Sequence, residues 1–321
     1  MIDSHNRVID YMRISITDRC NLRCIYCAPE TVRTLPEDEL LTYQEILRIC
    51  GEASRLGIRF VKLTGGEPLM REGVPELVSL LKTKAGIERV TLTTNGVLLL
   101  RHLDALRGAG IDGITVSLDS LDPERFKATT GSGRLADIMA GIRESVGLNI
   151  PVKLNAVLIG GGGEPAWRDL AELAATEPLT VRFIEMMPIG YGGKFQGVSN
   201  DELLERMRKV YPGIAEDRSA QGAGPAVYYH IPGFKGHIGF ISAMSHKFCR
   251  TCNRIRLTAD GLLKPCLCYA GGVDVKAALR RGGSIREALL AAAALKPRSH
   301  CFTGAAPEKP TEQRIMSAIG G

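Results

Sequence analysis

Short segments of alternating hydrophobic and polar residues recur between residues 11 and 185, separated by stretches with helical periodicity. The alternating segments predict strands at residues 11–17, 59–64, 89–94, 113–119, 151–158 and 180–185. The stretches between them predict helices at residues 42–56, 74–84, 98–109, 135–146 and 165–175. This spacing is typical of right-handed βαβ units, so we expect an α/β fold on a parallel sheet.

The two faces of the predicted strands decide between an open sheet and a barrel. Parallel strands covered by helices on both faces normally read as continuous apolar runs, whereas these strands alternate. The first strand sets Arg13 against Ile14, and later strands carry further cations on the same polar face: Lys62, Lys153 and Arg182. A polar inner face is costly unless it lines a ligand-filled cavity, and six units are too few for a closed eight-stranded barrel. We therefore expect an incomplete (β/α)6 TIM-type barrel whose lumen is the binding site.

The pattern changes after residue 185, where Gly and Pro become frequent. Residues 226–231 and 235–241 predict a hairpin, residues 254–257 a short strand, and residues 285–295 a helix. We expect a partial barrel over residues 1–215 and a C-terminal α+β extension over residues 216–321 that closes the barrel mouth. The tail from residue 297 is expected to be irregular down to the terminal glycines, Gly320 and Gly321.

Composition narrows the class of protein. With 45% hydrophobic and 24% charged residues, the 321-residue chain has ample material for a core, which excludes a disordered protein. The longest apolar run, residues 288–295, is far short of the roughly 20 residues that span a bilayer. The first ten residues lack an apolar stretch, so we expect no signal peptide and a cytoplasmic location. The net charge of +6 is compatible with an anionic ligand and decides nothing alone.

Nine cysteines point to bound metal. An odd count in a chain without an export signal argues against a disulfide framework. The first cluster, Cys20-x3-Cys24-x2-Cys27, directly follows the first strand, and a loop can bring its three thiols together. A zinc site is one interpretation, since Cys-x2-Cys pairs are common there. The other is a four-iron cluster, where three protein ligands leave one iron open to S-adenosylmethionine (SAM).

A second cluster lies in the C-terminal part. It offers three thiols in a Cys-x2-Cys-x13-Cys spacing and a fourth thiol two residues later: Cys249, Cys252, Cys266 and Cys268. A zinc ribbon has similar spacing. Arg254 and Arg256, two residues apart on the predicted strand, point to one side, and forked guanidinium groups suit phosphate. The alternative for this pair is a solvated strand edge.

These motifs together resemble the radical SAM superfamily. Its Cys-x3-Cys-x-aromatic-Cys signature is matched by the first cluster with Tyr26, and its glycine-rich turn by Gly65-Gly66-Glu67-Pro68. Within the superfamily the chain resembles the GTP cyclases of molybdenum-cofactor synthesis over nearly its whole length. The motifs that carry this resemblance begin at Arg13 (RISITDRCN), Thr93 (TTNG), Val116 (VSLD), Arg182 (RFIE) and Phe248 (FCRTCNRIRLT).

The resemblance implies two [4Fe-4S] clusters, held by Cys20, Cys24 and Cys27 and by Cys249, Cys252 and Cys266. It implies SAM contacts at Tyr26, Gly66, Glu67, Ser117 and Met187. It implies GTP contacts at Arg13, Lys62, Thr93, Lys153, Arg182, Arg254 and Arg256. No residue is assigned as a catalytic acid, base or nucleophile, because the cofactor carries the radical chemistry.

The resemblance also implies partners, and the chain differs from the family pattern at two positions. The expected partners are GTP, an electron donor, cyclic pyranopterin monophosphate synthase downstream and a second copy of the chain, with no nucleic acid and no membrane. Lys62 stands where the family usually has arginine, and Cys268 could replace Cys266 as a ligand. The terminal glycines resemble the family's C-terminal end, which reaches toward the active site.

Two other functions are compatible with parts of the sequence. A radical SAM enzyme that modifies a peptide is one, although such enzymes usually carry a more cysteine-rich C-terminal region. A zinc-stabilised RNA-binding module is the other, although its aromatic-rich surface is not expected at 5% aromatic residues.

Overall fold

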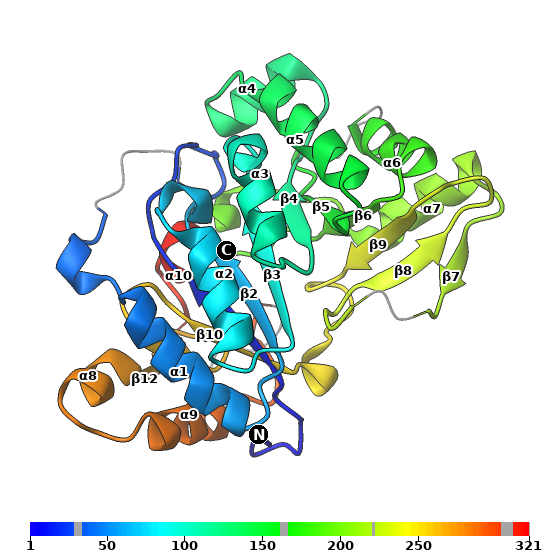
Figure 1. Cartoon of the computed structure of the whole chain (residues 1–321). Helices are drawn as coiled ribbons and strands as arrows, with labels where there is room; N and C mark the ends of the chain where they lie inside the picture. Colours follow the sequence, from blue (N-terminus) through cyan, green and yellow to red (C-terminus); the bar gives the residue numbers. More distant parts are fainter. Residues whose placement is uncertain (29–33, 161–165, 220–221, 303–310, 321) are drawn as a thin grey trace.

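Twelve strands form one sheet in the computed structural model, which describes residues 1–28, 34–160, 166–219, 222–302 and 311–320. Their order is β12-β11-β10-β1-β2-β3-β4-β5-β6-β9-β8-β7 (Figure 1). Pro165, the first residue of a predicted helix, and the terminal Gly321 lie outside the described residues.

The six predicted strands are confirmed and lie side by side in parallel. They are β1 (Tyr11–Ser15), β2 (Phe60–Thr64), β3 (Arg89–Thr94), β4 (Ile114–Ser117), β5 (Val152–Ala156) and β6 (Thr180–Ile184). Two further parallel strands extend the sheet at both edges: β10 (Arg254–Leu257) beside β1, and β9 (His237–Ile241) beside β6. The sheet is not closed into a full ring in the described residues, which fits the expected partial barrel.

Antiparallel strands complete both edges. On one side β8 (Val227–His230) pairs with β9 as the predicted hairpin, followed by β7 (Ala215–Asp217). On the other side β11 (Leu262–Lys264) and β12 (Val273–Asp274) follow β10. The C-terminal part is thus built into the same sheet as the barrel, and a division of the chain at residue 215 stays a prediction.

The predicted helices appear as α1 (Tyr43–Arg55), α2 (Val74–Thr83), α3 (Leu99–Gly108), α5 (Leu135–Gly147), α6 (Ala166–Thr176) and α9 (Ile285–Ala294). The sequence reasoning missed α4 (Pro123–Thr130), α7 (Asn200–Val210), α8 (Val275–Arg280) and α10 (Met316–Ile319). The expectation of an irregular tail is wrong for its last described residues, because α10 forms there. The signals for α4 and α7 were present, since Asp122 and Ser199 cap their N-termini.

The strand alternation separates core from lumen as expected. Ile14, Val61 and Leu63 are buried against the helices, whereas Arg13 and Lys62 on the same strands point to the other face. The helices thereby bury the apolar face, and the polar face is left to line an interior space. Among the described helices, none has the length and apolar character needed to cross a membrane.

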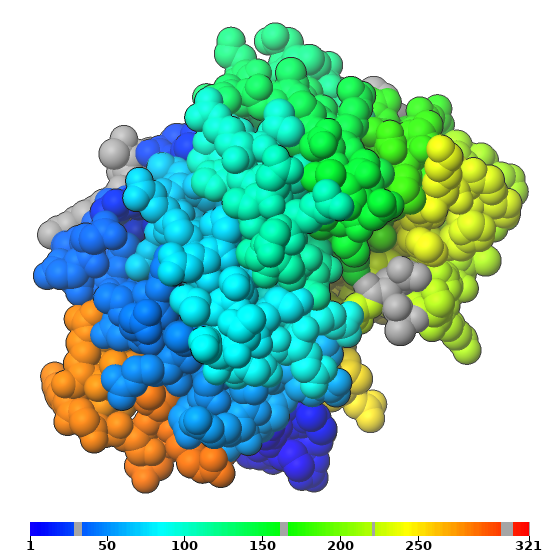
Figure 2. All heavy atoms as spheres, in the orientation of Figure 1, coloured from blue at the N-terminus to red at the C-terminus, as the bar shows by residue number. Residues whose placement is uncertain are grey.

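Two helices of the C-terminal part, α8 and α9, pack near the first helix of the chain, α1. Figure 2 shows the orange segment that contains α8 and α9 against the blue segment that contains α1. An ion pair joins Arg280 of α8 to Glu45 of α1 at 2.7 Å. Glu45 also closes a capping box at the start of α1, in which Thr42 accepts from the Glu45 backbone N–H and donates its own N–H to the Glu45 carboxylate.

This capping box generates a stability prediction. Thr42→Ala removes the acceptor for an unpaired helix N–H, so we expect the free energy of unfolding to fall by about 1 kcal/mol. Thr42→Ser keeps the hydroxyl and should stay close to the original chain. Denaturant unfolding measures both, and an equal loss in the two variants would contradict the capping role.

Candidate functional site: two cysteine groups around a cationic lumen

Two groups of cysteines lie at opposite ends of neighbouring parallel strands. The first group is Cys20, Cys24 and Cys27, and the second is Cys249, Cys252 and Cys266. Cys20 follows the carboxyl end of β1, whereas Cys252 precedes the amino end of β10, and the two strands pair in parallel. A strand rises roughly 3.3 Å per residue, so the five-residue length of β1 sets the groups about 16 Å apart along the barrel. The lumen-facing side chains of β1 and β10 lie between them.

The first group consists of three partly exposed cysteines in one loop, Cys20, Cys24 and Cys27. Burial raises the pKa of all three thiols, to about 12 for Cys27, and nearby cysteines raise the pKa of Cys24 and Cys27 further. Three cysteines gathered in one loop fit a metal centre, which would hold their sulfurs deprotonated in spite of this rise.

Tyr26, within this loop, is held by the barrel. Its hydroxyl donates to Asp119 at 2.6 Å, and the other oxygen of Asp119 accepts the backbone N–H of Val157 after β5. Asn95, which follows β3, donates its amide to Asn21 at 2.7 Å and lies 3.8 Å from the Cys20 sulfur. The TTNG motif that contains Asn95 was recognised in the sequence, but this contact of Asn95 was not predicted.

The glycine-rich turn after β2 lies directly against the cysteine loop. The Gly66 N–H donates to the carbonyl of Thr17 at 2.8 Å, and the Glu67 N–H donates to the carbonyl of Arg19 at 2.7 Å. A Cβ atom at Gly66 would overlap the Arg19 carbonyl, so only glycine allows this approach. Two backbone hydrogen bonds thus join the turn to the cysteine loop.

The Glu67 side chain is fully buried, and its hydrogen bonds are made within the turn and to the residues at the end of β3. Its carboxylate accepts the backbone N–H groups of Leu69 and Asn95 and the hydroxyl of Thr94. Burial raises its pKa to about 7. We therefore assign it a positioning role in the turn, while its contact with a cofactor stays a prediction. The other expected SAM residues lie at strand ends, Ser117 at the end of β4 and Met187 after β6.

The second group is braced by two cations that the sequence reasoning missed. Lys296 is buried and donates to the Cys252 sulfur at 3.4 Å and to the carbonyls of Arg254 and Pro265. Although burial raises the pKa of Cys252, Arg254 and Lys296 lower it overall to about 7. Arg7 reaches across from the N-terminus to the carbonyl of Cys249 at 2.7 Å.

Cys268 has another cysteine as its neighbour. Its sulfur lies 3.1 Å from the sulfur of Cys301, a residue outside both cysteine clusters. The Cys301 N–H also donates to the Cys268 sulfur at 3.3 Å. Cys268 is therefore directed to Cys301, which favours Cys266 as the third thiol of the second group.

Cysteine thiols near one another can ligate either zinc or an iron–sulfur cluster. Among the described residues, no three His, Cys, Asp or Glu side chains are arranged to hold a single metal ion.

A belt of cations crosses the lumen between the two groups. Strand register sets Arg13 of β1 beside Lys62 of β2 on one side and Arg256 of β10 on the other. Lys62 donates to the Thr115 hydroxyl at 2.9 Å, and Arg182 donates to the same hydroxyl at 3.3 Å. Thr115 is thus the point at which two of the cations meet.

These cations repel one another in a buried setting. Burial, Arg182 and Arg13 lower the pKa of Lys62 well below its usual range. Burial, Arg254 and Arg182 lower the pKa of Arg13 to about 10, although Tyr11 acts in the opposite direction. In the described part of the chain, neither Lys62 nor Arg182 makes an ion pair. A bound polyanion would relieve this repulsion.

Unsatisfied polar atoms lie on the same face of the strands as these cations. Thr93 Oγ1, Asn155 Oδ1 and Arg182 Nε are buried without a hydrogen-bond partner in the described residues. A cavity of about 480 Å³ opens near the amino ends of the strands, and its lining includes Lys62, Lys153 and Arg182. The structure thereby brings these three expected GTP residues to one space.

The last two expected GTP residues approach from β10. The guanidinium of Arg254 lies 5.1 Å from the centre of the Phe248 ring, and that of Arg256 donates to the Gly320 carbonyl at 2.7 Å. Gly320 packs against Ser15 and Thr64, at the carboxyl ends of β1 and β2. The expectation that the tail reaches the lumen is confirmed for Gly320.

Two family models match the chain. The radical SAM superfamily model covers residues 14–174, and the Molybdenum Cofactor Synthesis C model covers residues 179–302. The curated relatives include GTP 3',8-cyclases from Heliobacterium modesticaldum, 44% identical, and Clostridium perfringens, 42% identical. Both similarities extend over 100% of this chain and 100% of the relative.

A solved structure shares the fold. The crystal structure of Streptococcus suis SuiB bound to S-adenosylmethionine superposes with a TM-score of 0.63 at 16% identity. The match covers 83% of this chain and 63% of SuiB.

The cationic belt predicts polyanion binding. Inorganic tripolyphosphate should raise the melting temperature by about 5 °C at a hundredfold excess over its dissociation constant. Arg182→Gln should remove at least half of that shift, whereas Arg107→Gln on the exposed face of α3 should not. Thermal melts with and without the anion measure this, and a full shift in Arg182→Gln would contradict the assignment.

Proposed function

The chain belongs to the GTP 3',8-cyclase family of radical SAM enzymes in molybdenum-cofactor biosynthesis, and we propose that its cationic lumen holds the triphosphate of GTP. The carrying observation is that Arg13, Lys62 and Arg256 stand in register on three neighbouring strands between the two cysteine groups. The alternative of a peptide-modifying enzyme and that of an RNA-binding module are both less compatible with full-length similarity to cyclases.

The first cysteine group would hold the catalytic four-iron cluster. With SAM bound, that cluster would supply by reductive cleavage a 5'-deoxyadenosyl radical that takes a hydrogen atom from C3' of GTP, so that C3' bonds to C8 of guanine and one electron and one proton from the reductant and solvent complete the product. Cys20, Cys24 and Cys27 would bind the cluster, and the glycine-rich turn with Gly66 would lie beside it. The Tyr26–Asp119 hydrogen bond holds the loop to the end of β4.

The role of the protein in the reaction is to orient GTP. Arg13, Lys62, Lys153 and Arg182 would bind the phosphates, far from the bonds that change. Arg254 and Arg256 would reach the same phosphates from β10 with forked donors. Binding energy at this remote part holds C3' within reach of the first cluster, which replaces a random encounter by a fixed geometry.

The second cysteine group would hold a second four-iron cluster. Cys249, Cys252 and Cys266 would supply three ligands, which would leave one iron without a protein ligand and available to the guanine ring. Lys296 and Arg254 support this by stabilising the Cys252 thiolate. Thr93 Oγ1, buried and without a partner in the described residues, is a further candidate contact for GTP.

Other parts of the proposal concern partners. Because SAM cleavage is reductive, an electron donor must dock near the first cluster. We expect the product to pass to cyclic pyranopterin monophosphate synthase, and a second copy of the chain to form a homodimer.

An anaerobic incubation tests the function. Reconstituted protein with SAM, GTP and a reductant should convert GTP to an isomer of unchanged mass and altered chromatographic retention, with one 5'-deoxyadenosine per product. Formation of 5'-deoxyadenosine that never depends on GTP would overturn the proposal.

The arginine pair on β10 generates a binding prediction. Arg254→Ala with Arg256→Ala removes two charge-assisted contacts, so we expect the GTP dissociation constant to rise about a hundredfold. Iron and sulfide content should be unchanged, because Lys296 still contacts the Cys252 sulfur. The exposed pair Arg281→Ala with Arg286→Ala is the matched control. Equilibrium dialysis measures both, and unchanged affinity in the β10 double variant would contradict the role.

Lys153 generates a pH prediction. Burial, Arg182 and Arg89 lower its pKa to about 8, so above pH 8 the phosphates must bind together with a proton. GTP affinity should therefore fall as the pH rises from 7 to 9. Lys153→Met should bind more weakly at pH 7 and lose part of this dependence, whereas the exposed Lys209→Met should keep it. Parallel pH profiles in Lys153→Met and the original chain would contradict the assignment.

A further inference from the structure

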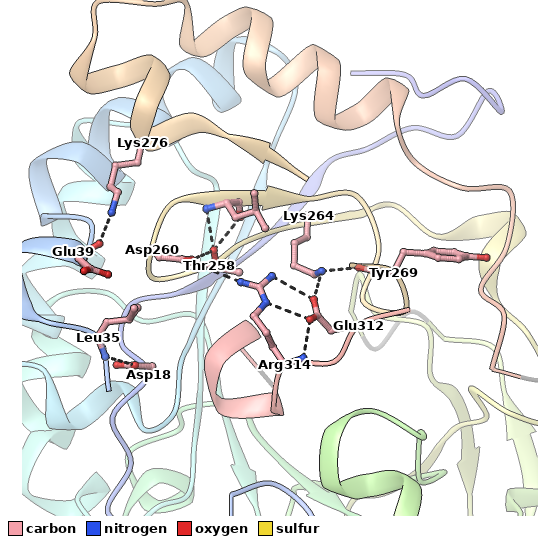
Figure 3. A network of polar contacts seen from close by, with 11 residues as sticks. Asp18, Leu35, Glu39, Thr258, Asp260, Lys264, Tyr269, Lys276, Glu312 and Arg314 are labelled. Carbon is pink, nitrogen blue, oxygen red and sulfur yellow. Dashed lines mark hydrogen bonds and ion pairs between the residues drawn. The ribbon is translucent and has the colours of Figure 1, made fainter. Parts of the chain in front are cut away.

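A buried ionic network anchors the C-terminal segment beside the second cysteine group (Figure 3). Glu312 is at its centre, with a side chain 2% exposed. It pairs with the fully buried Lys264 at the end of β11 and with Arg314 two residues further along the chain. Lys264 also donates to the carbonyl of Tyr269 at 2.6 Å.

The network ties the tail to the loop that carries Cys266. The Glu312 N–H donates to the carbonyl of Cys268 at 2.8 Å, and Thr311 forms a β-bridge with Tyr269. Both partners lie in the loop after β11 that contains Cys266. The start of the tail is therefore fixed to the second cysteine group by backbone and side chain alike.

The far end of the tail reaches the first cysteine group and the lumen. The Ser317 backbone lies close enough to the Cys27 sulfur to oppose the rise in the pKa of that thiol that burial causes. The carbonyl of Gly320 accepts from Arg256, and a Cβ atom on Gly190 would lie 3.1 Å from the Cα atom of Ile315, so the tail also passes close over this glycine. A segment of ten residues thus contacts both cysteine groups and one proposed phosphate ligand.

The cations around Glu312 explain why this buried position of the network carries a carboxylate. Lys264 of β11 pairs in register with Arg256 of β10, so the two cations are direct cross-strand neighbours. Glu312 pairs with the buried Lys264, and Arg256 is left as the cation that meets the tail carbonyl and the lumen. Arg314 shares Glu312 with Lys264 and also pairs with Asp260 at 3.7 Å. Without the Glu312 carboxylate, the buried Lys264 ammonium would lose its ion-pair partner.

We propose that Glu312 is a positioning residue that fixes the C-terminal tail across the lumen, so that the Gly320 carbonyl orients Arg256 for the triphosphate. The inference rests on the proposed function for the identity of the ligand. Loss of the anchor frees the tail, and Arg256 loses the contact that orders its side chain.

Hydrogen exchange and GTP binding together test this role. In the reconstituted full-length chain, Glu312→Gln should speed amide exchange in residues 311–320 at least tenfold. It should also raise the GTP dissociation constant about tenfold, with SAM binding unchanged. Glu205→Gln, which breaks the exposed pair with Arg208, is the matched control and should change neither.

A double-mutant cycle separates positioning from a general structural effect. In a chain that lacks residues 316–321, Glu312→Gln should leave the GTP dissociation constant within twofold of the truncated parent, because no tail remains to be positioned. An equal weakening in the full and truncated chains would overturn the proposal, as would unchanged exchange in residues 311–320 of Glu312→Gln.

A milder variant covers the case in which Glu312→Gln does not fold. Arg314 is one-third exposed, so Arg314→Gln should accelerate the same exchange by a smaller factor, and no acceleration would count against the anchor. Exchange does not depend on turnover, so the anchor and the GTP assignment can fail separately. If the original chain binds no GTP, the proposed function fails, while exchange in Glu312→Gln still decides the anchor.

Discussion

Mutual repulsion of cations inside one lumen is the constraint on which the arrangement depends. Arg13, Lys62 and Arg256 stand side by side on three strands, and Arg182 meets Lys62 at one hydroxyl group. A carboxylate in the cavity lining, Asp112, is already paired with Lys82 at 2.7 Å. Such a lumen is costly when empty and gains stability from a polyanion, which is the charge that a nucleoside triphosphate brings.

The direction of the parallel strands places the two cysteine groups at opposite ends of the lumen. Parallel β1 ends at the first group, and parallel β10 begins at the second, so a strand's length of cationic wall lies between them. Segments distant in sequence stabilise each end: Arg7 and Lys296 at the second group, and the glycine-rich turn with Asn95 at the first. The described tail crosses from one group to the other, anchored through Glu312.

Much of this could be predicted from the sequence because its signals are local. Period-two alternation located six strands and put Arg13, Lys62, Lys153 and Arg182 on one face, and cysteine spacing located both groups. Contacts across long separations gave no such signal. Arg7 meets Cys249 across 242 residues, and Lys264 meets Glu312 across 48. A four-residue strand such as β10 has no pattern that names its neighbour, so its parallel pairing with β1 had to come from the structure, and the four-residue α10 is too short for periodicity.

The proposed function requires one lumen that serves both the first cysteine group and the GTP phosphates. The most direct measurement is anaerobic turnover with GTP deuterated at C3', followed by mass analysis of the 5'-deoxyadenosine formed. The account predicts that 5'-deoxyadenosine gains one deuterium, because C3' is held beside the first cysteine group. Unlabelled 5'-deoxyadenosine formed alongside product would contradict it, since the hydrogen would then come from elsewhere.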